Sequence, residues 1–127
     1  MRDERVLRYF RLAQIESLKS NHHSHKMGAV FVRKNHIISS GCNFLTKTHP
    51  FVRRLDPHKT MHAEVDAIFK LKNKDQLKGS SVFIYRENVF GPAIARPCPI
   101  CMQILKIFGI RKAYYTVNGQ WAMEKIL

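Results

Sequence analysis

Hydrophobic residues recur at helical spacing in three segments of the chain. This pattern predicts helices over residues 2–21, 61–74 and 99–109. Asp3 is available as a cap for the first helix, and Gly109 predicts the end of the third. The apolar positions of the first helix are Val6, Phe10, Ala13 and Leu18.

Other segments are β-rich and bounded by turn residues. Residues 29–32 and 36–40 predict a hairpin whose turn is the polar segment 33–35. Later strands are expected at residues 80–85, 111–117 and 120–126. The dipeptide Asn118-Gly119 is a strong two-residue hairpin signal, so the last strand should fold back antiparallel on the strand before it.

The order of these elements indicates an α/β protein. Strands alternate with helices and end in a hairpin, which predicts a five-stranded mixed sheet between three helices, with one catalytic domain over residues 1–127. Residues 44–60 contain two prolines, two histidines and several basic residues with little periodicity, which is typical of a long functional loop. Residues 87–96 predict a second loop.

The net charge of the chain adds polyanions to its expected partners. The chain has 22 Lys and Arg against 9 Asp and Glu, a net charge of +13 and a sequence pI of about 10.1. Such a balance is common in proteins that bind polyanions, but it is also compatible with a simply basic, well-solvated surface. Only three cysteines are present, and neither a leader peptide nor an apolar run of about 20 residues is visible. We therefore expect a soluble, cytoplasmic protein.

Cys98 and Cys101 in "PCPIC" form the first chemical signal. They open a predicted helix, where N–H groups and the helix dipole favour thiolates, so metal binding is expected. A redox pair has the same spacing, yet this C-x-x-C follows three predicted strands rather than one. No second C-x-x-C is present, which excludes a four-cysteine zinc ribbon.

A histidine must complete the site, and His62 in "HAE" is the best candidate because it also opens a predicted helix. Three protein ligands leave one coordination position for a water, whose pKa zinc lowers to about 7. Glu64, two residues later, can then move a proton from that water to a substrate.

The two motifs together, H-x-E and P-C-x-x-C, are the signature of zinc nucleobase deaminases. The chain resembles the cytidine deaminase-like superfamily along most of its length, including "MGAVFV" and the asparagine of "GCN". The resemblance implies a three-layer α/β/α fold, one catalytic Zn²⁺ held by His62, Cys98 and Cys101, and Glu64 as acid/base.

The resemblance to this superfamily also implies which residues contact the substrate. Asn43 matches a residue that touches the sugar or base, although it could merely cap a turn, and the Ala63 backbone N–H is expected at the base carbonyl. The activated water would attack C4 of cytosine or C6 of adenine, with ammonia leaving. Residues around these motifs complete the expected substrate contacts: Phe44, Tyr85, Arg86, Arg96 and Pro97.

The resemblance does not assign a subfamily. Arg96 stands where tRNA adenosine deaminases usually have glutamate and APOBEC-type polynucleotide deaminases usually have serine. The closing hairpin resembles free-cytidine deaminases and some toxin-type deaminases, rather than the tRNA, deoxycytidylate and APOBEC groups.

Cytosine in single-stranded DNA or RNA is the favoured substrate, because basic residues exceed the two or three that a mononucleotide needs. Aromatic residues near those loops could stack on bases, or could simply close the core. The basic and aromatic residues considered are Lys47, Arg53, Arg54, Lys59, Phe51 and Phe90.

Other interpretations stay open. The alternative substrate is a free nucleotide or nucleoside (dCMP, CMP or cytidine). A different class of function is a non-catalytic zinc domain that binds nucleic acid. Arg2, Arg5, Arg8 and Arg11 form either a phosphate-tracking stripe or a solvated face. The cluster His22, His23 and His25 could hold a second metal, but three loop histidines without acidic neighbours are more often solvated.

Overall fold

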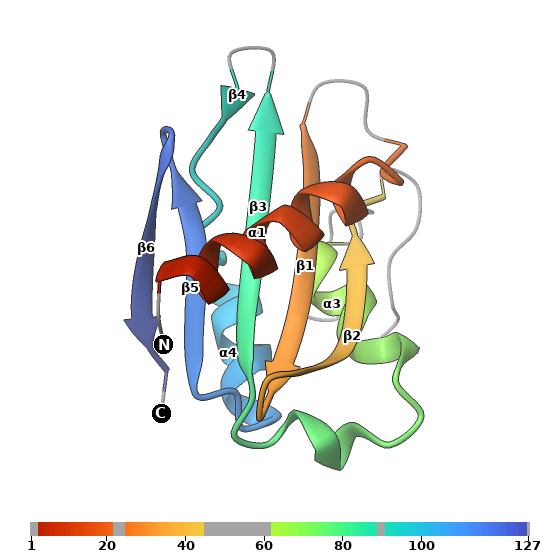
Figure 1. Ribbon diagram of the computed structural model, residues 1–127. Helices are drawn as coiled ribbons and strands as arrows, with labels where there is room; N and C mark the ends of the chain where they lie inside the picture. Colours follow the sequence, from red (N-terminus) through yellow and green to blue (C-terminus); the bar gives the residue numbers. More distant parts are fainter. Residues whose placement is uncertain (1–2, 22–24, 45–61, 89–90, 127) are drawn as a thin grey trace.

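The structure is a computed structural model that describes residues 3–21, 25–44, 62–88 and 91–126; the side chains of residues 3, 88, 91 and 92 are outside the description. Its helices and strands, labelled as in Figure 1, are α1 (Asp3–Ser17), β1 (Lys26–Arg33), β2 (His36–Cys42), α3 (Ala63–Lys70), the 3-10 helix η1 (Lys74–Leu77), β3 (Ser81–Asn88), β4 (Gly91–Pro92), α4 (Pro99–Ile107), β5 (Lys112–Val117) and β6 (Gln120–Lys125).

One mixed sheet forms the centre of the molecule. Its strands lie in the order β2-β1-β3-β5-β6, and the short β4 pairs with β3 outside this path. The β3/β5 pair is parallel, whereas β1/β2, β1/β3 and β5/β6 are antiparallel. The predictions of a mixed five-stranded sheet and a closing antiparallel hairpin are confirmed. The prediction of residues 87–96 as a loop is wrong at Glu87 and Asn88, which belong to β3, and at Gly91–Pro92, which pair with them as β4.

Helices cover both faces of the sheet (Figure 1), which confirms the predicted three-layer class. We call the two sides the α1 face and the α3/α4 face. Apolar residues alternate along the central strands, so Val30 and Phe83 pack under α1, while Ala29, Phe31 and Ile84 pack under α3 and α4. This alternation decides which side chains can reach each face.

Two tight turns follow their residue types. In the β5/β6 hairpin, Asn118 has φ 43° and Gly119 has φ 89°, the left-handed pair that a two-residue hairpin turn requires. In the β1/β2 hairpin the same role falls to Lys34 and Asn35, with φ of 51° and 64°. The predicted turn 33–35 is therefore shorter by one residue, because Arg33 belongs to β1.

Helix α1 presents its predicted apolar positions to the sheet, with one exception. Val6, Phe10 and Ala13 are buried. Leu18 is 61% exposed and lies beyond the last residue of α1. The prediction for Leu18 is wrong because the buried stripe continues to Ser17 instead.

Helix α3 is shorter than the predicted segment 61–74. It ends at Lys70, and Leu71 adopts an extended conformation with φ −74° and ψ 129°. The Lys74 ammonium donates to the Leu71 carbonyl at 2.7 Å, and the Asn73 side chain caps η1. Polar side chains therefore satisfy the backbone where the helix stops. No helix in the described part of the chain has the length and apolar content to cross a membrane.

Candidate metal centre and catalytic carboxyl

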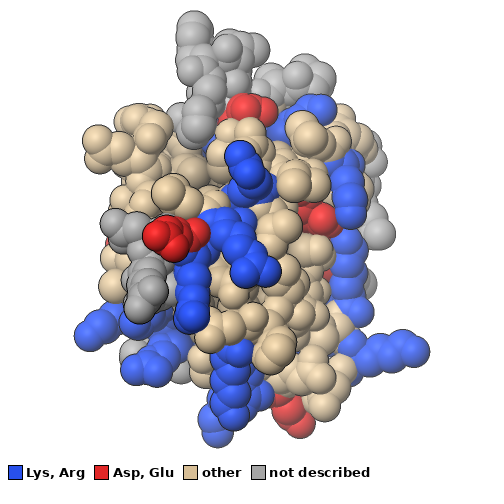
Figure 2. All heavy atoms as spheres, in the orientation of Figure 1, with Lys and Arg blue, Asp and Glu red and all other residues tan. Residues whose placement is uncertain are grey.

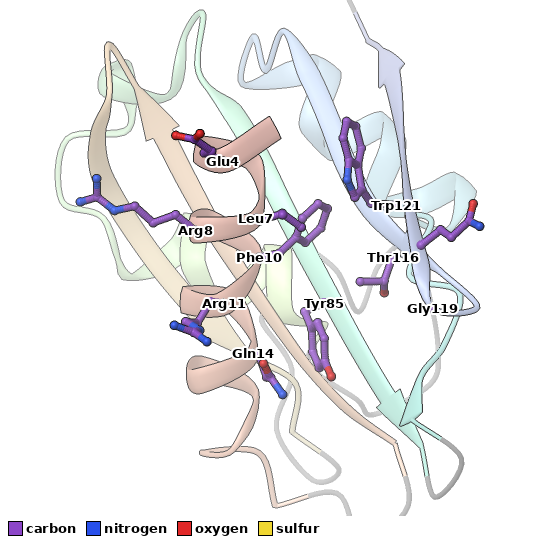
Figure 3. Close-up of a pocket in the computed structure, with 11 residues that line it drawn as sticks. Glu4, Leu7, Arg8, Phe10, Arg11, Gln14, Tyr85, Thr116, Gly119 and Trp121 are labelled. Atoms are coloured by element: carbon purple, nitrogen blue, oxygen red, sulfur yellow. The ribbon is translucent and has the colours of Figure 1, made fainter. Parts of the chain in front are cut away.

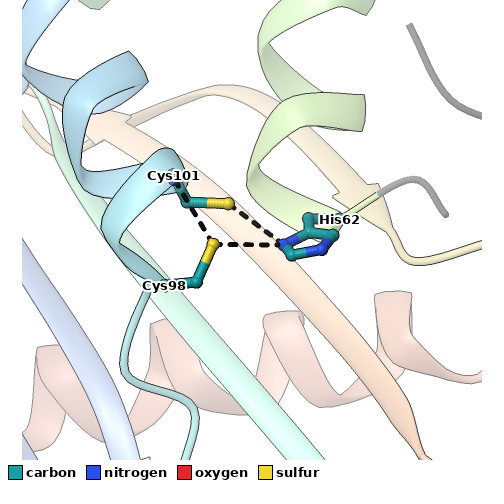
Figure 4. A group of neighbouring side chains, drawn as sticks. All are labelled: His62, Cys98 and Cys101. Atoms are coloured by element: carbon teal, nitrogen blue, oxygen red, sulfur yellow. Dashed lines mark hydrogen bonds between the residues drawn. The ribbon is translucent and has the colours of Figure 1, made fainter. Parts of the chain in front are cut away.

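Helices α3 and α4 begin next to each other on the α3/α4 face. His62 is the N-cap of α3, with φ −80° and ψ 152°, and Cys98 is the N-cap of α4, with φ −66° and ψ 165°. Pro99 occupies the first position of α4, where a missing N–H costs nothing. Figure 4 shows the His62 ring between the two helix starts, facing both sulfur atoms.

The three predicted ligands come together at metal-binding distances. His62 Nδ1 lies 3.1 Å from Cys101 Sγ and 3.8 Å from Cys98 Sγ, and the three donor atoms are within 4.8 Å of one another. Donors bound tetrahedrally to one zinc ion would be about 3.6 Å apart for Zn–S and Zn–N bonds of about 2.3 and 2.1 Å. The donor set and its spacing therefore fit Zn²⁺.

The two cysteines differ in ionisation although they share one motif. A hydrogen bond from the Cys101 thiol lowers the pKa of Cys98 to about 4, with further support from His62 and from the Cys101 backbone N–H, which lies 3.4 Å from the Cys98 sulfur. The same hydrogen bond and burial raise the pKa of Cys101. These shifts favour a thiolate at Cys98 and a protonated thiol at Cys101, whose proton a metal would displace.

Glu64 lies beside this cluster in the interior. It is 2% exposed, and its Oε1 has no hydrogen-bond partner among the described residues. Burial raises the pKa of its carboxyl, although the nearby His62 opposes this shift. Glu64 and Cys101 are close enough to affect each other's pKa through a hydrogen bond. A buried carboxyl oxygen without a partner fits a site built to receive a metal ligand or a substrate.

Buried polar contacts hold α3 on β2. The Cys42 backbone N–H donates to Asp66 Oδ2 at 3.1 Å, and the same oxygen lies 2.9 Å from Lys70 Nζ. Ser39 Oγ donates to the Ala67 carbonyl at 2.6 Å. Sequence reasoning missed Asp66; its signal is a second acidic residue among the apolar positions of the segment that follows Glu64. These contacts position the start of α3, and with it His62.

Asn43 follows β2 on the α3/α4 face, and its side chain is bonded to the backbone. Its Oδ1 accepts from the Met27 N–H at 2.9 Å, and its Nδ2 donates to the His25 carbonyl at 2.9 Å. Within the described residues, these two bonds use one amide hydrogen and one lone pair of the Asn43 side chain and leave one of each. The predicted substrate contact therefore has a structural role as well, as a clamp between β1 and β2.

Arg86 is directed to the α3/α4 face by strand alternation, two residues after the core residue Ile84. Its Nη1 donates to the Ile94 carbonyl at 3.3 Å, and its Nη2 lies 3.3 Å from His25 Nδ1. Of the three clustered histidines, His25 therefore lies beside the Arg86 guanidinium. His22 and His23 lie outside the described residues. Arg96 is exposed and its Nε lies 3.0 Å from Glu124 Oε1 on β6.

The remaining predicted contacts divide between the two faces. Ala63 and Pro97 are buried next to the ligands, and Phe44 packs against the core of the α3/α4 face. Tyr85 packs under α1 instead, and its hydroxyl donates to Glu87 Oε1 at 3.1 Å. The structure does not bring Tyr85 to the metal cluster, because the sheet separates them. The loop residues considered as nucleic-acid contacts lie outside the described residues: Lys47, Phe51, Arg53, Arg54, Lys59 and Phe90.

Residues 3–117 match the model of the cytidine and deoxycytidylate deaminase zinc-binding region. The chain belongs to this family. Zinc is accordingly the metal that suits the cluster of His62, Cys98 and Cys101. No sequence among the curated proteins matches this member of the family significantly.

Solved deaminase structures share the fold. The dCMP deaminase of cyanophage S-TIM5, in its apo form, is 26% identical, with a TM-score of 0.67 over 94% of this chain and 89% of that one. The cytidine deaminase of Burkholderia pseudomallei is 16% identical, with a TM-score of 0.68 over 99% and 94%. That of Mycobacterium tuberculosis is 13% identical, with a TM-score of 0.60 over 99% and 92%.

Proposed function

We propose that this zinc deaminase hydrolyses cytosine to uracil and ammonia in a free nucleotide, with deoxycytidylate as the preferred substrate. The observation that carries the reaction is the buried Glu64 carboxyl beside the cluster of His62, Cys98 and Cys101, with an Oε1 that has no hydrogen-bond partner among the described residues. The dCMP deaminase at 26% identity, which also crystallised with dCMP and dUMP, supports a monomeric substrate.

Each residue has a distinct part in the reaction. Bound zinc supplies an activated water at neutral pH. His62, Cys98 and Cys101 would hold the metal, and Glu64 would accept a proton and deliver it to the base and its leaving amine. Burial raises the pKa of the Glu64 carboxyl above its ordinary value, which favours a group that can hold the transferred proton.

The described residues favour a free nucleotide over a polynucleotide. Tyr85 lies on the other face of the sheet, so it offers no stacking surface at the metal, and Arg96 is paired with Glu124. Arg86 remains on the α3/α4 face, where unused N–H donors of its guanidinium could meet a single phosphate. The expectation of single-stranded nucleic acid becomes the second candidate, supported by the net charge of +13.

The test compares deoxycytidylate, deoxycytidine and a cytosine-containing oligonucleotide at low and high salt, with ammonia release as the readout. We expect the zinc-loaded protein to deaminate deoxycytidylate fastest. Glu64→Gln should lower kcat by about a hundredfold to ten-thousandfold while zinc content is unchanged, because only the proton transfer is lost. Glu4→Gln, the same change at an exposed position, should have no effect.

Three results would contradict the proposal. Turnover of the oligonucleotide alone, with strong salt dependence, would establish the second candidate instead. Undiminished turnover by Glu64→Gln would remove the assigned mechanism. Absence of any turnover with all three substrates would favour the non-catalytic zinc domain.

A further inference from the structure

The α1 face has a groove that the proposed deaminase reaction does not use. In the described part of the chain α1 is the helix on this face, and it packs mainly on β1 and β3. Beside it, toward the β5/β6 hairpin, lies a groove of about 620 Å³. Figure 3 shows Leu7 and Phe10 of α1 directed toward Trp121 of β6 across this groove.

Trp121 is a fixed ring with a solvent-facing side. It is the single tryptophan of the chain and is 36% exposed. The rings of Phe10 and Tyr114 support it at centroid distances of 6.3 and 6.0 Å. Leu7, opposite, is 57% exposed. A planar apolar group could therefore enter the groove and stack on Trp121 without rearranging the core.

Positively charged side chains of α1 lie beside this groove. Arg8 and Arg11 line it, and a second hollow of about 290 Å³ on the same face is lined by Arg5, Arg111 and Lys112. Glu4 is the acidic residue among the lining residues of the two hollows. Figure 2 shows this face of the molecule, where Lys and Arg outnumber Asp and Glu. In Figure 3 Arg8 extends from α1 on the side away from Trp121, so cations and ring lie on opposite sides of the helix.

These charges are not neutralised within the described residues. The salt bridges found there join Lys19 to Glu16, Lys70 to Asp66 and Arg96 to Glu124. Arg5 donates to the neutral Asn35 side chain, and Arg8 lies over the Tyr9 ring at 5.9 Å. Among the described residues, this surface thus carries positive charge without an acidic partner on one side of α1 and an exposed aromatic ring on the other.

We infer that the α1 face binds a single-stranded nucleic acid, separately from the catalytic site on the other side of the sheet. The strand would cross α1 with its phosphates near Arg5, Arg8 and Arg11 and would place one base against Trp121. Charge complementarity favours this occupant, since a chain of net charge +13 repels a second copy of itself. A backbone of phosphates with stacked bases matches both features of the surface.

The experiment uses the zinc-loaded protein and oligothymidylate or oligouridylate, probes that contain no cytosine. We expect either probe to quench the fluorescence of Trp121 and to bind in a salt-dependent way. In a polarisation assay, Arg8→Gln/Arg11→Gln should weaken binding at least tenfold and reduce the salt slope by about 1.4, the value for two phosphate contacts on a single strand. Trp121→Ala should weaken binding about fivefold or more.

The matched control is Lys72→Gln/Lys78→Gln, which removes the same charge from exposed positions after α3. It should bind the probes like the wild type, and zinc content and melting temperature should show that every variant is folded. Equal weakening by this control, or no quenching of Trp121, would overturn the inference. Anionic phospholipid vesicles that bind with the same dependence on Arg8 and Arg11, while oligonucleotides do not, would also overturn it.

Discussion

Single residues in the cluster have different roles because their surroundings differ. Cys98 at the start of α4 receives hydrogen bonds from the Cys101 thiol and backbone, so its pKa falls, whereas burial helps to raise the pKa of Cys101. Glu64, enclosed in the same region, is shifted toward its neutral form. A thiolate, a thiol and a carboxyl that can hold a proton are thus arranged around one candidate metal position.

Zinc binding should therefore release about one proton at neutral pH, since two thiolates are needed and Cys98 already supplies one. Protons compete with zinc for Cys101, so affinity should rise about tenfold per pH unit between about pH 6 and pH 8 and fall on acidification. Calorimetry in two buffers of different ionisation enthalpy, with a competing chelator, measures both quantities.

Cys42→Ala is the matched control, because Cys42 is a buried thiol outside the cluster. This variant should show the same proton release as the wild type. Zinc binding without proton release, or loss of the pH dependence on changing Cys42, would contradict the assignment of Cys101 as the proton-bearing ligand.

Elements are positioned by close backbone contact as well as by side chains. A Cβ at Gly41 in β2 would lie 2.5 Å from the Ala67 nitrogen and 2.8 Å from the Ala63 carbonyl oxygen of α3. A Cβ at Gly28 in β1 would lie 1.9 Å from the Ala13 carbonyl oxygen of α1. Both helices can approach the sheet this closely only because glycine stands at these positions.

Gly41→Ala should push α3 away from β2 and displace His62 at its start. We expect a loss of about 1–3 kcal/mol in the free energy of unfolding, together with weaker zinc binding. Denaturant unfolding and zinc titration measure the two effects. Gly119→Ala, which meets no atom within 4 Å but has φ 89°, should lower stability without changing zinc affinity. Equal zinc affinity in Gly41→Ala and the wild type would contradict the positioning role of this contact.

For the whole molecule, the metal would add a link between the starts of α3 and α4, two helices that already pack against each other on one face of the sheet. His62 belongs to one helix start, and Cys98 and Cys101 to the other. If zinc binds the folded chain but not the unfolded chain, it raises the free energy of unfolding by about 4 kcal/mol when its free concentration is a thousandfold above its dissociation constant.

Chelation should accordingly lower the melting temperature of the zinc-loaded protein by about 10 °C or more. Added zinc should restore it. Cys98→Ala should melt at one temperature with and without chelator, because one of the three ligands is missing. Differential scanning calorimetry measures these melting temperatures. A rise in the melting temperature of Cys98→Ala on adding zinc would show that another residue holds the metal.

The sequence alone was sufficient for the features that depend on local spacing. Asn118-Gly119 specified the last hairpin because its turn needs two left-handed residues. The metal ligands were recognisable because helix starts supply the same local chemistry wherever they occur; they are His62, Cys98 and Cys101. The order of strands and helices predicted the three layers.

Only the tertiary structure decided which side of the sheet each residue faces and where the elements end. Tyr85 and Arg86 are neighbours in sequence, yet strand alternation sends Tyr85 under α1 and Arg86 to the α3/α4 face. Leu18 and residues 71–73 have helical patterns but lie outside the helices, because α1 ends at Ser17 and α3 ends at Lys70. The pairing of Asp66 with the Cys42 backbone depends on contacts between segments 24 residues apart, which no local pattern contains.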